Sequence, residues 1–401
     1  MKVKILIFVF IFLFTCTFSY SEQIYTFKSS SEILTVDFID NQLFLFLDSG
    51  TLWIIDLENK TPSIIDIGGP VFFPMFKNGD SLFFVTSPGS IIKGSELHQY
   101  QHTDITLNEL YLPDNSIKKK EIGLKNIFQF EMHFPFFYLA SERKFVVFDY
   151  NKKTEFQNFI YPTGALISDN ELLILYREND AQGMFRIMTV NFKSFPDINI
   201  LDFKLKNAEV IRFDSQLKIM SSENSYKLFN EKKKIFEDLK IPVPEYEFIG
   251  SKNDFLVFSN KNNFLLKSSK TKIIIEKNKF ENLDLTSRIN ILITNNDYFS
   301  FYSYNENFFQ LYVYNITSEK LIYKEEFLIS SITNPKVWFY SFDNDIFIIQ
   351  EDTLKSLNLN GEEFEISNEK IIWGITQVKF INNYAIISDN KNIFVFSLNT
   401  N

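Results

Sequence analysis

Cysteine is almost missing from this sequence: the only one is Cys16, close to the N-terminus. A disulfide needs two cysteines and a thiolate metal site needs several, so neither is available to the chain. The fold must therefore be held by its apolar core. A chain of this length can bury roughly three quarters of its unfolded surface, which is enough for that purpose.

Glycine is also scarce, with 12 residues against 47 phenylalanines. Tight turns usually need residues that tolerate a positive φ angle, and glycine is the usual choice. Asparagine and aspartate are the other residues that tolerate this conformation best. We therefore expect the turns of this protein to use Asn and Asp where other β-proteins use Gly.

Clustered positive charge is limited to two triple-lysine runs, 118–120 and 232–234, in a chain with a formal net charge of -9. Nucleic-acid binding depends on cations that neutralise phosphates, so this charge balance excludes nucleic acid as a partner. Each run lies near the junction of an expected strand and turn. Solvated lysines at such positions protect sheet edges, and we interpret the runs in that way.

The N-terminus reads MKVKILIFVFIFLFTCTFSYSEQ, with lysines ahead of an apolar run, 5–14, and small residues after it. This order is typical of a secretory signal peptide, which we assign to residues 1–21. The protein is then exported, to the periplasm or the extracellular space. An uncleaved anchor remains an alternative. So does lipidation of Cys16, which would add weak membrane association, although Thr15 stands where lipoprotein signals carry Gly, Ala or Ser.

A two-strand pattern, first seen in DNQLFLFLDSGTLWIIDLENK, recurs along the whole mature chain. Its apolar runs are continuous, which indicates strands that are covered on both faces. The hairpins begin near Asn41, Asp80, Phe134, Asn170, Ser215, Asn253, Asp297, Asn344 and Asn383. Their average spacing of about 43 residues lies within the period of four-stranded propeller blades, roughly 40 to 50 residues.

These repeats predict an all-β protein: a β-propeller of eight or nine four-stranded blades in a single domain, residues 22–401. Each hairpin supplies strands b and c, and shorter strands a and d flank it. The last unit lacks its strand d, whereas a spare strand, 23–28, precedes the first unit. We expect the N-terminal strand to complete the last blade, so that no sheet edge is left bare there. A β-sandwich is the competing fold.

The pattern resembles the β-propeller superfamily of WD40, YVTN and quinoprotein-like repeat proteins, through an N-x-hhhh-turn-hhhhD/N hairpin in which h is apolar. The chain lacks the Trp-Asp, Gly-His and Asp-box signatures of the specific families. Its three tryptophans, Trp53, Trp338 and Trp373, do not recur at the blade period. We therefore expect no quinone and no other cofactor.

In propellers of this kind the b–c and d–a loops lie at one face, around the mouth of the channel. The second b–c loop, SPGSIIKGSELHQYQHT over 87–103, is much longer than the others and contains Glu96, His98, Tyr100 and His102. Insertions on a regular scaffold often carry specificity, so we assign these residues to binding. We expect a short amphipathic helix here. The i, i+4 histidines could hold a metal, but no third ligand is evident, so we assign no metal site.

Aromatic residues in the d–a connections are further candidates, because exposed Tyr and Trp often anchor partners. They are Tyr161, Tyr246 and Trp373. Acidic residues occur in most b–c loops, and nothing distinguishes a catalytic pair among them.

The sequence thus predicts an exported, monomeric and non-enzymatic module that binds or scaffolds a protein or glycan partner. The alternative is an envelope enzyme, a hydrolase or lyase with or without a metal, whose site lies at the channel mouth. A third interpretation is an assembly scaffold similar to propeller lipoproteins. Fold resemblance supports each of these functions only weakly.

Overall fold

The computed structural model describes most of the chain after the N-terminal segment. The described residues are 23–29, 31–71, 73–87, 91–93, 98–100, 105–152, 154–158, 161–168, 170–177, 184–201, 205, 208–214, 217–222, 225–242, 245–284, 286–305, 308–328, 337–342, 345–350, 353–359, 363–367, 377–381, 384–388 and 391–397. Within these ranges the only helix is a single 3₁₀ turn, Lys277–Lys279. A helix long and apolar enough to cross a bilayer is therefore absent from them.

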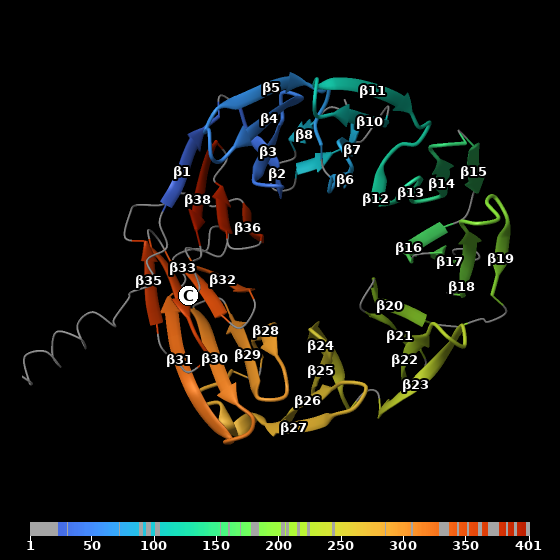
Figure 1. Cartoon of the computed structure of the whole chain (residues 1–401). Coiled ribbons are helices and arrows are strands. Elements are labelled where there is room, and N and C mark those ends of the chain that lie inside the picture. Colours follow the sequence, from blue (N-terminus) through green and yellow to red (C-terminus); the bar gives the residue numbers. More distant parts are fainter. Residues whose placement is uncertain are drawn as a thin grey trace, which may run out of the picture. The chain divides into compact units, whose positions relative to one another are not determined.

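The described strands form nine antiparallel sheets of four strands each, and the fold is a nine-bladed β-propeller (Figure 1). The chain divides into two compact units, one of residues 34–56 and 61–277 and one of residues 1–33, 57–60 and 278–401. The six sheets of the first unit are β2 (Ile33–Ile39), β3 (Gln42–Leu47), β4 (Thr51–Asp56) and β5 (Pro62–Asp66); β6 (Phe76–Asn78), β7 (Ser81–Thr86), β10 (Thr106–Tyr111) and β11 (Ser116–Glu121); β12 (Ile127–His133), β13 (Phe136–Ser141), β14 (Lys144–Asp149) and β15 (Thr154–Asn158); β16 (Tyr161–Ile167), β17 (Glu171–Arg177), β18 (Phe185–Asn191) and β19 (Ile198–Ile200); β20 (Ala208–Phe213), β21 (Lys218–Ser222), β22 (Ser225–Asn230) and β23 (Ile235–Pro242); and β24 (Glu247–Lys252), β25 (Phe255–Ser259), β26 (Asn263–Lys267) and β27 (Lys272–Glu276).

The second unit holds the last three sheets. They are β28 (Arg288–Thr294), β29 (Tyr298–Tyr304), β30 (Phe308–Asn315) and β31 (Lys320–Leu328); β32 (Val337–Phe342), β33 (Asp345–Gln350), β34 (Thr353–Leu357) and β35 (Glu363–Ser367); and β36 (Gln377–Ile381), β37 (Tyr384–Ser388) and β38 (Asn392–Ser397) with β1 (Gln23–Lys28). The N-terminal strand thus completes the last sheet, where Phe27 pairs with Ile393. The predicted completion of the last blade by the N-terminal strand is confirmed. The sequence predicted eight or nine blades, and the structure has nine four-stranded sheets.

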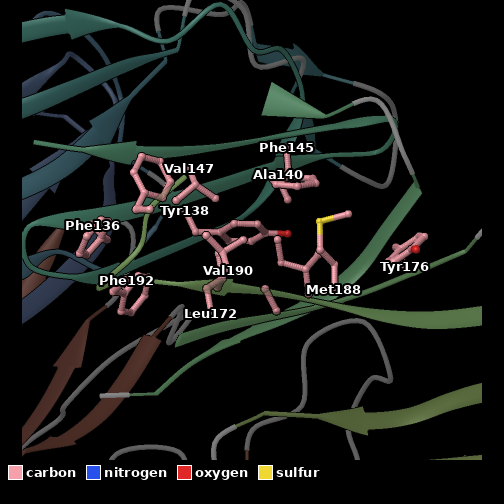
Figure 2. Close-up of a cluster of buried hydrophobic side chains, with 13 residues drawn as sticks. Phe136, Tyr138, Ala140, Phe145, Val147, Leu172, Tyr176, Met188, Val190 and Phe192 are labelled. Atoms are coloured by element: carbon pink, nitrogen blue, oxygen red, sulfur yellow. The ribbon is translucent and has the colours of Figure 1, made fainter. Parts of the chain in front are cut away.

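The cores lie between neighbouring sheets, which explains the continuous apolar runs. Tyr138 and Phe145 of the third sheet pack against Leu172, Met188 and Val190 of the fourth, and all five side chains are buried (Figure 2). The same strand β13 sends Phe137 and Leu139 in the opposite direction, into the cluster shared with the second sheet. A middle strand therefore buries both of its faces, as its sequence predicted.

Several turns use asparagine or aspartate in the left-handed conformation, as the shortage of glycine predicted. Asn41 has a φ of 64°, Asn115 of 56° and Asn253 of 52°. Gly50 remains essential for a different reason. A Cβ atom added to it would lie 2.7 Å from the backbone nitrogen of Gly69, so its turn leaves no room for a side chain.

The first strands of five sheets share a feature that the hairpin pattern did not indicate. β12, β16, β20, β24 and β28 each carry one extra residue against their partner strand, in turn Phe128, Thr163, Ile211, Ile249 and Leu292. A β-bulge of this kind bends a strand and increases its twist. In the first unit β12 contacts β16 and β16 contacts β20, so the bulges occur where the sheets approach one another at their first strands (Figure 1).

Polar side chains connect these first strands across neighbouring sheets. The amide of Gln129 on β12 donates to the carbonyl of Ala165 on β16 at 2.9 Å and accepts from its N–H at 3.0 Å. In the second unit the Ser341 hydroxyl of β32 donates to the Leu292 carbonyl of β28 at 2.6 Å. Such contacts satisfy backbone groups that have no strand partner on that side.

The described part of the long insertion contains two paired strands, so the expected amphipathic helix is wrong there. β8 (Ile91–Lys93) pairs antiparallel with β9 (His98–Tyr100), with His98 opposite Lys93. Two adjacent β-branched residues, Ile91 and Ile92, favour a strand over a helix that would be too short to be stable alone.

Candidate functional site

A groove lies between the fifth and sixth sheets. It lies within the first unit and has a volume of about 760 Å³. Its walls come mainly from β22 and β23 on one side and from the ends of β26 and β27 on the other. We call it the β23–β26 groove; its lining residues are Leu217, Lys218, Leu228, Phe229, Glu231, Asp238, Leu239, Lys240, Ile241, Asn253, Asp254, Leu256, Lys267, Ser268, Ser269 and Lys272.

The floor of the groove is apolar because two sheets share a hydrophobic cluster beneath it, whereas the rest of the lining is polar or charged. Leu217, Ile241 and Leu256 are buried members of that cluster, and Leu239 packs against it. Leu228 of β22 is half-buried and also lines the groove. Apolar surface that is only partly covered favours a ligand that brings apolar groups of its own.

A β-bulge of three residues in β23 shapes one wall of the groove. Asp238 pairs with Lys227 and Pro242 pairs with Ser225, so residues 239–241 of β23 face the single residue Tyr226 of β22. Lys240 has a φ of 53° at the centre of this bulge. At this bulge Ile241 is buried, whereas the neighbouring Lys240 is exposed.

The deepest charge in the groove is Lys218, whose side chain is 6% exposed and forms an ion pair with Glu231. Burial lowers the pKa of Lys218, and the nearby Asp214 carboxylate opposes that change. Glu231 is 51% exposed and so stays hydrated. The groove therefore has an ion-paired ammonium at the edge of its apolar floor.

The rim carries charges of both signs, but they are not equally matched. Asp238 accepts from the Lys227 ammonium at 2.9 Å and from the Ser225 hydroxyl at 3.1 Å. Three other cations, the ammonium groups of Lys240, Lys267 and Lys272, form no ion pair or hydrogen bond with any described residue. Asp254 is the one rim carboxylate that likewise forms no ion pair or hydrogen bond with a described residue. The groove therefore offers more unpaired positive than negative charge.

Three of the seven binding residues predicted from sequence lie outside the part of the chain that the structure describes. Glu96, His102 and Trp373 are not among the described residues, and neither are Cys16 and the 1–21 segment. His98 and Tyr100 are the first and last residues of β9. Their role in binding stays a prediction.

Tyr161 is the first residue of β16 and Tyr246 lies immediately before β24, so both occupy d–a connections, as expected. The guanidinium of Arg143 lies 5.8 Å from the ring centre of Tyr161. Tyr246 precedes β24, its carbonyl accepts a 3.1 Å hydrogen bond from the Tyr226 hydroxyl, and its half-buried ring packs on the cluster beneath the groove. Neither residue lines the groove.

Sequence reasoning missed the groove because it examined the other ends of the sheets. The groove is lined by the turn between β24 and β25 and by the turn between β26 and β27, whereas the predicted residues occupy the b–c and d–a connections. A local signal did exist in KSSKTK, which places Lys267 and Lys272 on either side of a short polar turn. Their significance depends on β23, which is distant in sequence.

A second polar cluster, around Glu109, is already satisfied by its own partners. Its carboxylate accepts from Ser81 at 2.9 Å, from Lys118 at 3.3 Å and from the Tyr150 hydroxyl. Burial opposes ionisation of Glu109, but these bonds outweigh it and hold the pKa below its usual value. Burial and the bond to Glu109 raise the pKa of Tyr150 to about 12. Within the described ranges no three His, Cys, Asp or Glu side chains are placed to hold a metal.

Comparison with known proteins gives the fold and no family. No family model and no curated protein matches this sequence. Among solved structures, BamB from Moraxella catarrhalis is similar with a TM-score of 0.50 at 10% identity, over 94% of this chain and 99% of that one. The computationally designed Ika8 protein (TM-score 0.44, 9% identity, 94% and 99%) and apo AztD from Citrobacter koseri (0.40, 12%, 82% and 95%) also match. At such identities the likeness to BamB shows a shared propeller fold alone.

Proposed function

We propose that this protein is an exported, non-enzymatic binding module, and that a segment of a protein partner occupies the β23–β26 groove. The observation that carries the proposal is the combination of an apolar floor with charged walls in a groove between two sheets. Ligand sites of this size commonly pair an apolar lining with a few polar groups that fix orientation. The N-terminal sequence supports export.

Binding accounts for the lining residues better than catalysis does. The lining contains neither histidine nor cysteine, and its buried cation, Lys218, is matched by Glu231. Nucleophilic catalysis needs an activated nucleophile beside a base, and no hydrogen bond joins such a pair among the described lining residues. The alternative of an envelope enzyme therefore gains no support from this site.

A protein partner fits the floor better than a glycan. Leu217, Leu228, Leu239, Ile241 and Leu256 are aliphatic, and Phe229 is the only aromatic lining residue. Burial of apolar surface is the dominant favourable contribution in most protein–protein association. A sugar usually stacks on a flat aromatic face, and the single aromatic lining residue, Phe229, is buried.

The proposal is tested by capture of partners from a cell-envelope extract of the source organism on the immobilised mature protein. Leu228→Ser removes apolar surface from the groove, and Ile274→Ser is the matched control, because Ile274 is 54% exposed on β27 and does not line the groove. We expect the bound protein to be released by Leu228→Ser and kept by Ile274→Ser.

Two results would contradict the proposal. One is capture that both variants retain equally, which would place the site elsewhere. The other is turnover of esters or glycans by the purified protein, which would make it an enzyme.

A further inference from the structure

A pair of lysines on the second wall of the groove is placed at a cost to the fold. Lys267 ends β26 and Lys272 begins β27, and the two are direct partners across the antiparallel ladder. Directly opposed side chains lie about 5 Å apart at their Cβ atoms, and like charges there are destabilising. No described carboxylate neutralises either ammonium. Such a pair is relieved by an anion bound between its members.

The opposite wall contributes a third cation through the β23 bulge. Lys240 is exposed at the centre of the bulge, between half-buried Leu239 and buried Ile241. The bulge therefore brings one cation beside the apolar residues of this wall. β23 is the last strand of its sheet, and no described strand pairs with its second edge.

The carboxylates of the rim limit where an anion can lie. Asp238 is held by Lys227, and Glu231 is held by Lys218. Asp254, in the turn between β24 and β25, has no partner among the described residues and would repel a negative group. Anionic groups of a ligand are thus directed to Lys240, Lys267 and Lys272.

We infer that the groove binds an extended acidic segment of a partner protein, with acidic side chains on the three lysines and apolar side chains on the floor. This inference rests on the proposed function and names its ligand. A fatty acid carries one carboxylate and cannot meet cations on both walls. An extended peptide that alternates acidic and apolar residues presents several carboxylates on one face and apolar groups on the other.

The experiment uses fluorescein-labelled peptides and the mature protein in fluorescence anisotropy. The acidic peptide alternates Glu and Leu over about eight residues, which extends to about 26 Å. A peptide with Gln in place of Glu and one with Lys in place of Glu are the charge controls. We expect the acidic peptide to bind at least about tenfold more tightly than the Gln peptide, a difference of about 1.4 kcal/mol. Its affinity should fall as salt rises, because salt screens exposed charges.

Variants connect the binding to the proposed residues. The double variant Lys267→Gln and Lys272→Gln should weaken the acidic peptide at least about tenfold and leave the Gln peptide unchanged. Lys261→Gln is the matched control, since Lys261 is an exposed lysine in the turn at the other end of β25 and β26. It should change affinity less than about twofold.

Three outcomes would overturn the inference: equal binding of the Glu and Gln peptides, unchanged binding by the double lysine variant, or binding of laurate without binding of the acidic peptide. If any of these occurs while Leu228→Ser still releases the captured partner, the groove remains the binding site and only the acidic ligand is wrong. If Leu228→Ser also has no effect, the proposed function fails as well.

Discussion

Replacement of Gln129 by leucine tests whether polar contacts between first strands hold neighbouring sheets together. The two hydrogen bonds from its amide satisfy the N–H and the carbonyl of Ala165, a residue that is 4% exposed. Leucine has a similar size and can form neither bond. The variant Gln129→Leu therefore leaves one buried donor and one buried acceptor without a partner.

The expected loss follows from these two groups. Each unsatisfied buried group costs about 1 to 3 kcal/mol, which gives about 2 to 6 kcal/mol for the pair. Burial of the leucine side chain returns about 1 kcal/mol. We expect a net loss of about 3 kcal/mol in the free energy of unfolding, measured by urea denaturation followed by circular dichroism. Gln157→Leu is the control, because Gln157 is exposed on β15, and it should change stability by less than about 0.5 kcal/mol.

The pH dependence of this loss gives a second readout, through Glu131. Burial raises the pKa of Glu131, and a 3.2 Å hydrogen bond from Gln129 partly offsets that rise. A carboxyl whose folded pKa is raised contributes stability that is present below the unfolded pKa and lost as pH rises through the folded pKa. Loss of Gln129 raises the folded pKa further, so the variant should be more impaired near pH 8 than near pH 4. A loss below about 1 kcal/mol with no pH dependence would refute the reasoning and indicate that water replaces the amide.

Three further substitutions test separate features of the structure. Tyr138→Phe should stabilise the protein by about 1 kcal/mol in urea denaturation, because the Tyr138 hydroxyl is buried without a partner among the described residues; a clear destabilisation would mean that a bound water holds it. Lys218→Met should be neutral or stabilising by about 1 kcal/mol at pH 7, because burial disfavours the charged form of Lys218 and lowers its pKa. The advantage of methionine should shrink as pH rises toward the ordinary lysine pKa, where the wild-type side chain also becomes neutral. A stability difference that stays constant from pH 7 to the ordinary lysine pKa would contradict the lowered pKa of Lys218. Gly50→Ala should cost about 2 kcal/mol or more, because its φ is 76° and a Cβ would meet the backbone of Gly69; an unchanged thermal midpoint would show that the turn relaxes.

The repeat architecture was predictable because its signals are local. Leu43 to Leu47 form an unbroken apolar run, and a strand with both faces covered needs such a run wherever it lies in the fold. Turn positions such as Asn41 were equally readable, since few residues tolerate their backbone conformation. Completion of the last sheet by the 23–28 strand followed from counting strands, without any knowledge of their contacts.

The insertion marks the limit of local interpretation. Its histidines suggested a helix by their spacing, whereas Ile91 and Tyr100 pair across a hairpin. Spacing of four residues is compatible with both structures, and the choice depends on whether a neighbouring segment is available to pair. The bulges of the first strands are hidden for a similar reason: an extra residue is defined only against a partner strand.

Residue order alone was sufficient to specify a propeller of eight or nine sheets, the types of its turn residues and the strand that completes the last sheet, because each depends on patterns within a few consecutive positions; the folded chain decided for nine. The groove required the folded chain. Lys240 belongs to a bulge in β23, and Lys267 and Lys272 belong to the next sheet, so their shared cavity arises from the packing of two sheets. A charge pattern becomes a binding site only when distant segments bring it together around a common apolar floor.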